Sequence, residues 1–189
     1  MTETGRRFFG LGDNPRLHVV TADGRPYLAG TSRRWDAILV DAYRQPYIPF
    51  YLATREFFLL ARKHLRPGGV LALNVAALPG DNDLADDIAG TVATAFPRAW
   101  AWKPLRFSEL VLGFDRPVAR ARLSARVAGV HPSVSPLVPL FRAGVRPVRP
   151  AATPLTDDRA PVEWVTDRML VRYVAEGGML DERPLPTAP

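Results

Sequence analysis

The sequence predicts an α/β protein, a three-layer sandwich in which a sheet of parallel strands lies between helices. Short, continuous apolar segments at 37–40 and 70–73 are typical of strands covered on both faces. Segments with helical periodicity separate these apolar runs. The resulting order of strand, helix and strand favours parallel strands joined by right-handed crossovers.

The amino-terminal segment predicts two short helices around one strand. A helix over 2–10 ends near Gly10, a residue suited to a C-terminal cap. Leu17 to Val20 are expected to form a strand. Asp23 and Gly24 follow this strand, and Pro26 suits the first position of a helix over 26–30.

The middle of the chain predicts two strand–helix units. A strand over 36–41 ends at an acid, Asp41. A helix over 52–64 follows and stops at Arg66-Pro67-Gly68-Gly69. A second buried strand, 70–75, leads through the turn at 80–83 to a helix over 83–96.

The last part of the chain predicts a pair of strands and further helices. Trp100 and Trp102 alternate on a strand, so both can sit on one face, in the core or at a subunit interface. Thr156, Asp157 and Asp158 are expected to cap the final helix, with the two acids also available to arginines. The expected elements are strands 99–102 and 109–114, helix 117–128, a helical turn near 136–142 within a proline-rich crossing, and helix 160–175.

Composition narrows the classes of function. The 189 residues carry a net charge of +6 and no cysteine, which excludes disulfides and cysteine-based metal or nucleophile sites. The arginines are scattered, so no nucleic-acid footprint is expected. His18, His64 and His131 lack the spacing of a helical metal site. No apolar run is long enough to span a bilayer and no secretory signal is seen, so we expect a cytoplasmic protein without a membrane span.

Asp41 is the first candidate for chemistry. It follows the strand over 36–41, and ligands of open α/β sheets bind beyond the carboxyl ends of the strands. The alternative, that Asp41 caps a turn or pairs with a nearby arginine, stays open from the spacing alone.

Five segments form a specific ordered set: Val20–Arg25, Trp35–Ala42, Tyr47–Phe58, Leu65–Leu71 and Leu155–Glu163. Together they resemble the spermidine synthase (polyamine aminopropyltransferase) family, in particular its bacterial spermidine-synthase-like branch. The resemblance covers about residues 4 to 172 and implies a class I methyltransferase-like Rossmann domain.

The resemblance implies roles for residues around two strand ends. Asp23 and Gly24 match the pair that contacts the adenine of decarboxylated S-adenosylmethionine, and Ala42 belongs to the same co-substrate site. Asp41 matches the acid that positions and deprotonates the attacking amine, because an amine is nucleophilic only when neutral. The substrate-binding candidates are Tyr43, Arg44, Gln45 and Tyr47, and for the tyrosines and Gln45 packing of the loop against the sheet is an equal alternative.

The sequence departs from the family pattern in two respects. Arg44 stands where the family has a second acid that holds the distal ammonium of a diamine. The glycine-rich loop after the first family strand and the acid after the second are absent. In the implied strand order 3-2-1-4-5-7-6, strand 36–41 would be fourth and would become a sheet edge.

Three explanations account for the absent strands: a start upstream of Met1, a degraded relic, or strands supplied by a partner. The predicted division is a partial Rossmann domain over 1–128, a crossing over 129–154, a helix over 155–176 packed on the same domain, and a tail over 177–189.

The predicted function is aminopropyl transfer from decarboxylated S-adenosylmethionine, or S-adenosylmethionine, as co-substrate to an amine, incomplete in this chain alone. No permanently bound cofactor and no metal are expected. Alternatives are a non-catalytic paralogue and an S-adenosylmethionine-dependent methyltransferase-like protein. The expected partners are small nucleoside and amine substrates, with a homodimer or pairing with a full-length homologue as the protein–protein alternatives.

Overall fold

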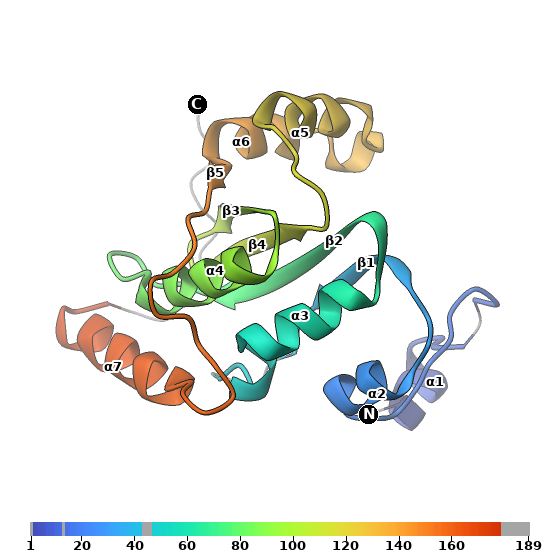
Figure 1. The fold of residues 1–189 in the computed structure, drawn as a ribbon, viewed down its shortest axis with the longest axis horizontal. Coiled ribbons are helices and arrows are strands. Elements are labelled where there is room, and N and C mark those ends of the chain that lie inside the picture. The colour runs from blue at the N-terminus through green and yellow to red at the C-terminus, as the bar shows by residue number, and fades with distance from the viewer. Residues whose placement is uncertain (1, 13, 43–46, 179–189) are drawn as a thin grey trace. The chain divides into compact units, whose positions relative to one another are not determined.

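The computed structural model describes residues 2–12, 14–42 and 47–178 (Figure 1). It divides the chain into two compact units, Met1–Thr31 and Ser32–Pro189, and each unit is described by itself.

The first unit contains two short helices, α1 (Thr2–Phe8) and α2 (Gly24–Gly30). Both confirm the helices expected in this region. The strand expected over 17–20 is wrong, because these residues form no ladder with another described strand. A strand needs a neighbour with which to exchange backbone hydrogen bonds, and an apolar pattern cannot supply one.

The second unit is built on a five-stranded sheet with the order β1-β2-β4-β3-β5. β1 is parallel to β2, as expected, whereas the β2–β4, β4–β3 and β3–β5 pairs are antiparallel, so the sheet is mixed. The tight turn between β3 and β4 allows only an antiparallel pair. The strands are β1 (Trp35–Val40), β2 (Leu65–Ala76), β3 (Arg98–Leu105), β4 (Ser108–Phe114) and β5 (Arg146–Pro147).

This order confirms the arrangement 4-5-7-6 for the four long strands, β1, β2, β4 and β3. The strand β1 lies at the edge, as the resemblance implied. The expectation that its apolar run is covered on both faces is wrong, since Ala37 is exposed and Leu39 is 77% exposed. Burial on both faces requires neighbouring layers, and the apolar run alone does not specify them.

The helices α3 (Arg55–Lys63) and α4 (Asp83–Ala95) cover one face of the sheet. α3 starts three residues later than expected. The hydroxyl of Thr54 accepts a hydrogen bond from the backbone N–H of Phe57 at 3.3 Å and so caps the helix, which follows a short 3-10 helix over Phe50–Leu52.

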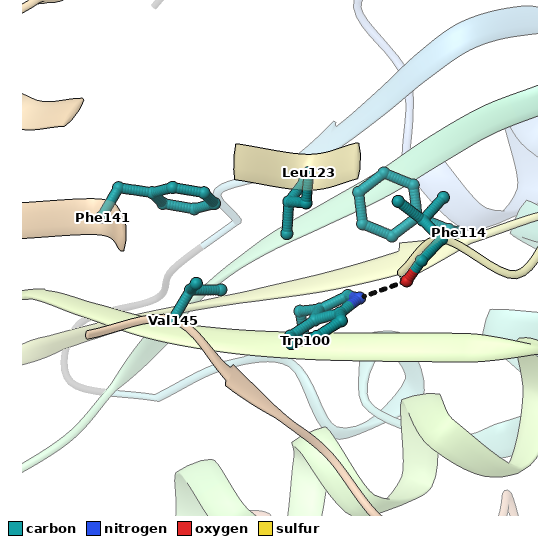
Figure 2. Close-up of a cluster of buried hydrophobic side chains, with 6 residues drawn as sticks. Trp100, Phe114, Leu123, Phe141 and Val145 are labelled. Atoms are coloured by element: carbon teal, nitrogen blue, oxygen red, sulfur yellow. Dashed lines mark hydrogen bonds between the residues drawn. The ribbon is translucent and has the colours of Figure 1, made fainter. Parts of the chain in front are cut away.

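The opposite face is covered by α5 (Arg120–Arg126) and α6 (Leu137–Gly144). Short 3-10 helices, Val127–Gly129 and Pro132–Val134, connect them. Trp100 lies at the centre of the core between these helices and the sheet (Figure 2), and Trp102 is packed against the same cluster. The prediction that both tryptophans lie on one face is confirmed. Of the two alternatives, core or subunit interface, the structure shows the core.

The final helix, α7 (Val162–Ala175), begins without the predicted cap. Its N-cap is Pro161, whose side chain makes no capping hydrogen bond. Asp157 instead joins the start of α3, where it accepts a hydrogen bond from the Thr54 hydroxyl at 2.7 Å. Ion pairs of Arg168 and Arg172 with acids around the start of α4 attach α7 to the body of the unit. The capping prediction failed because a polar cluster before a helix can equally bind a distant helix start.

Gly113 on β4 marks a tight contact between the sheet and α4. A methyl group added there would lie 2.8 Å from the Phe96 ring and 3.0 Å from Val92. We expect Gly113→Ala to lower the free energy of unfolding by about 1–3 kcal/mol through overpacking. Gly129→Ala is the matched control, since an added methyl there meets nothing within 4 Å. Urea denaturation of both variants measures the effect, and equal stability of the two would contradict the contact.

Candidate active site

Asp41 lies directly after the carboxyl end of β1, with an exposed side chain. The amide Nδ2 of Asn74 donates a hydrogen bond to its Oδ1 at 3.0 Å. Within the described ranges, Asp41 forms no ion pair with an arginine. Arg44 lies outside those ranges, so the alternative of an arginine partner stays open. The other carboxylate oxygen of Asp41 takes no part in the hydrogen bond with Asn74, and the side chain is exposed at the edge of the sheet.

Asn74 and Ser108 continue this contact across the sheet. The Ser108 hydroxyl donates to Oδ1 of Asn74, so polar side chains from β1, β2 and β4 form one continuous string. Sequence reasoning missed both residues. The rule that singled out Asp41 also applied to Asn74, which lies near the carboxyl end of the next parallel strand. Ser108 carried no such signal, because its strand runs in the opposite direction.

The strand register explains the string. Val40 is paired with Leu73 in a parallel ladder. The next residues of the two segments, Asp41 and Asn74, therefore also lie side by side. Ser108 is paired with Ala76, two residues from Asn74 on the same face of β2. Side chains two residues apart on one strand share a face of the sheet, and the Ser108 hydroxyl reaches Asn74 across this diagonal. The backbone pairing therefore places the three residues close together, and side-chain hydrogen bonds join them.

Tyr47 is bound to α7. Its hydroxyl donates a hydrogen bond to Oδ1 of Asp167 at 2.6 Å. This bond raises the pKa of Tyr47, because loss of the proton would break the bond and set two negative charges side by side. The structure thus gives Tyr47 a packing contact, and its predicted role in substrate binding stays a prediction. Tyr43, Arg44 and Gln45 lie outside the described residues.

Asp23 caps α2 in the first unit. Its Oδ1 accepts a hydrogen bond from the backbone N–H of Arg25 at 3.1 Å. A side chain at Gly24 would meet nothing within 4 Å, so the start of this helix is open. Asp23 and Gly24 belong to a different unit from Asp41, and their role as adenine contacts stays a prediction. Ala42 is exposed and follows Asp41 directly.

Lys103 lies near the loop that follows β2. Its ammonium donates to Oδ1 of Asn82 at 2.9 Å and to the carbonyl oxygen of Leu78. Burial lowers the pKa of Lys103, partly offset by the charge of Glu109. Among the described residues, no group of three or more histidines and acids is arranged to hold a metal ion. No helix in the described part of the chain has the length and apolar character needed to cross a bilayer.

No protein-family model matches the sequence. Curated relatives do match. A probable polyamine aminopropyl transferase of Bifidobacterium longum is 39% identical over 81 residues, 42% of this chain and 18% of the relative. The polyamine aminopropyltransferase of Mycobacterium tuberculosis strain H37Rv is 30% identical over 154 residues, 79% of this chain and 28% of the relative.

The chain is therefore spermidine synthase-like in sequence over the matched residues. It covers less than two thirds of the length of each of these relatives. The probable spermidine synthase of Corynebacterium glutamicum has a similar fold, with a TM-score of 0.58 at 18% identity over 99% of this chain and 61% of that one. A spermidine synthase in complex with the transition state analogue AdoDATO gives a TM-score of 0.53 at 18% identity, over 60% and 43% of the two chains.

The fold extends beyond the synthases. Human methyltransferase-like protein 13, in complex with SAH, gives a TM-score of 0.51 at 24% identity, over 64% of this spermidine synthase-like chain and 60% of that chain. This similarity supports the predicted methyltransferase-like Rossmann class and shows the fold alone.

Proposed function

We propose that this spermidine synthase-like chain carries the general base of an aminopropyl transfer site, Asp41, at the carboxyl ends of β1 and β2. The observation that supports this most is the position of Asp41. Its carboxylate follows β1, is held through one oxygen by Asn74, and is exposed on the edge where ligands of this sheet type bind.

The proposed reaction joins an amine to the aminopropyl group of a sulfonium nucleoside. A neutral amine attacks the methylene carbon beside the sulfonium, a C–N bond forms and the C–S bond breaks. The electron pair of the broken bond goes to sulfur, which leaves as a neutral thioether. The proton lost by the amine passes to Asp41. The sulfonium is a good leaving group, so the protein needs to supply mainly orientation and a base.

The proposed co-substrate is decarboxylated S-adenosylmethionine, with Ala42 as its proposed contact in the second unit. The adenine contacts expected in the first unit, Asp23 and Gly24, stay predictions. Two observations support an S-adenosylmethionine-related nucleoside. One structural neighbour was solved with the analogue AdoDATO, and another with SAH. The amine remains undefined in this proposal, because Arg44 stands where a second acid would hold a diamine.

A second candidate function is a non-catalytic partner of a full-length synthase. The exposed edge of β1 favours it, since Leu39 and Ala37 present an apolar, strand-shaped surface suited to pairing with another chain. Sedimentation of this chain mixed with a full-length homologue tests it. Formation of a mixed complex supports the partner role, and two separate species contradict it. A methyltransferase role has support from the fold alone.

Calorimetry tests the proposed catalytic role. Decarboxylated S-adenosylmethionine and methylthioadenosine are expected to bind the 189-residue chain, and Asp41→Asn is expected to retain binding. Where wild-type transfer to an amine is observed, Asp41→Asn should lower its rate by about 10²–10⁴-fold, the usual contribution of a general base. The control is Asp158→Asn, which replaces an exposed acid. Absence of binding by both nucleosides would contradict the proposal for this chain.

A further inference from the structure

We infer that Ser108 is a positioning residue for Asp41 and that it acts through the side-chain amide of Asn74. The effect of Ser108 on catalysis rests on the proposed function. The contacts of Ser108, Asn74 and Asp41 do not, and all three residues belong to the second unit. No role was expected for Ser108 or Asn74 from the sequence.

The order of donors along the string follows from the chemistry of the three side chains. An ionised carboxylate only accepts hydrogen bonds, so Asn74 must present its NH2 group to Asp41. The amide oxygen of Asn74 then faces Ser108, and an oxygen can only accept. The Ser108 hydroxyl is therefore the donor, as the structure has it. The carboxylate of Asp41 selects the orientation of the amide, and Ser108 holds the amide from its other side.

The selected orientation is the one that Asp41 needs. If the amide of Asn74 turned over, its oxygen would face the carboxylate of Asp41, and two acceptors would be placed against each other. The carboxylate of Asp41 opposes this turn. The Ser108 hydroxyl restrains the position of the correctly oriented amide, because it binds the amide oxygen on the side away from Asp41. One oxygen of Asp41 stays held, and the other keeps a fixed direction toward the open edge. A general base must be directed at the proton that it accepts.

The position of Ser108 suits such a role. It is the first residue of β4, half-buried, and paired with Ala76 of β2. It also lies directly after the tight turn from β3, whose backbone is held where the carbonyl of Phe107 accepts from the N–H of Ala77. Side chains on paired strands are held more accurately than side chains on loops. The string therefore joins an exposed acid to a fixed part of the sheet.

The first experiment measures the geometry without a ligand. In the ¹⁵N-labelled full chain, the side-chain NH2 resonances of Asn74 are expected to shift in Asp41→Asn and Ser108→Ala, in both cases toward the positions of exposed asparagines. Ser108→Thr keeps the hydroxyl and should restore the wild-type signals. Ser135→Ala is the control, since the Ser135 hydroxyl bonds the carbonyl of Pro132 at a distant exposed site. Unchanged Asn74 signals in Ser108→Ala would overturn the inference, provided that circular dichroism shows a folded variant.

The second experiment separates this inference from the proposed function. In turnover with a sulfonium nucleoside and an amine, Ser108→Ala should lower kcat by about 2- to 10-fold, equivalent to one hydrogen bond. The KM for the nucleoside should stay constant, and Ser108→Thr should restore kcat. Equal kcat for wild type and Ser108→Ala overturns the positioning role. Shifted Asn74 signals in a chain that binds no nucleoside support the positioning of Asp41 and overturn only the proposed function.

Discussion

Replacing Trp100 with alanine is expected to lower the free energy of unfolding of this chain by about 3–5 kcal/mol, the range typical of a buried tryptophan truncated in a core. Trp100 is 4% exposed and lies between the sheet and the helices α5 and α6 (Figure 2). Its removal leaves a cavity bounded by Phe114, Leu123 and Phe141, which surrounding side chains can fill only in part.

A hydrogen bond adds to the packing effect. The indole Nε1 of Trp100 donates to the carbonyl oxygen of Val118 at 3.2 Å, in the segment that leads from β4 to α5. Trp100→Phe keeps most of the apolar area but leaves this buried carbonyl without its donor, at a cost of about 1–3 kcal/mol. The two variants together separate the contribution of volume from that of the hydrogen bond.

The matched control is Trp164, on the outer face of α7. It is 62% exposed and stacks with the guanidinium of Arg168, 4.8 Å from its ring centre. Trp164→Ala should change the free energy of unfolding by no more than about 1 kcal/mol. Urea denaturation followed by circular dichroism measures both variants. A loss for Trp100→Ala no greater than that for Trp164→Ala would show that α5 and α6 do not pack on this face.

Replacing Arg146 with methionine is expected to cost about 3 kcal/mol of stability. Arg146 contacts Oε1 of Glu109 at 2.6 Å and Oδ1 of Asp86 at 2.8 Å. Glu109 is 2% exposed, whereas the side chain of Arg146 is 45% exposed. The variant leaves a buried carboxylate without its principal cation, and an unpaired buried charge is more costly than the loss of the pair itself.

A second substitution tests this reason for the loss. Glu109→Gln removes the buried charge, so the double variant with Arg146→Met is expected to recover at least about 1 kcal/mol relative to Arg146→Met alone. Arg149→Met is the control, since Arg149 is exposed and forms no ion pair among the described residues. Thermal and urea unfolding of the wild type, Arg146→Met, Glu109→Gln and the double variant give the coupling energy between the two residues. Additive effects of the two substitutions would show that the charge of Glu109 is not the cause.

The sequence was sufficient for most elements of the second unit. Apolar runs and caps predicted the helices α3 and α4 and the strands β1 to β4, because these signals depend on neighbouring residues in the chain. The strand at 17–20 failed for the opposite reason. Its pattern was local, but a strand exists only with a partner, and no described strand is paired with it.

Only part of the candidate site could be found from the sequence. Asp41 could be found from the sequence, since its place after a strand and its match to a family motif are both properties of the chain. Its partners could not. Asn74 and Ser108 are 33 and 67 positions further along, and only the strand register brings their side chains into one string. The role of Asp157 was likewise misassigned, because its partner Thr54 lies at another helix.

The sequence by itself determined the family resemblance, the order of the elements and the acid at the end of β1. The tertiary structure alone decided that β1 is an exposed edge, that the sheet is mixed and that the amide of Asn74 holds Asp41. The physical reason is the range of the interactions. Helix caps and apolar periodicity act within a few residues, whereas burial, strand pairing and side-chain hydrogen bonds depend on segments that only the fold brings together.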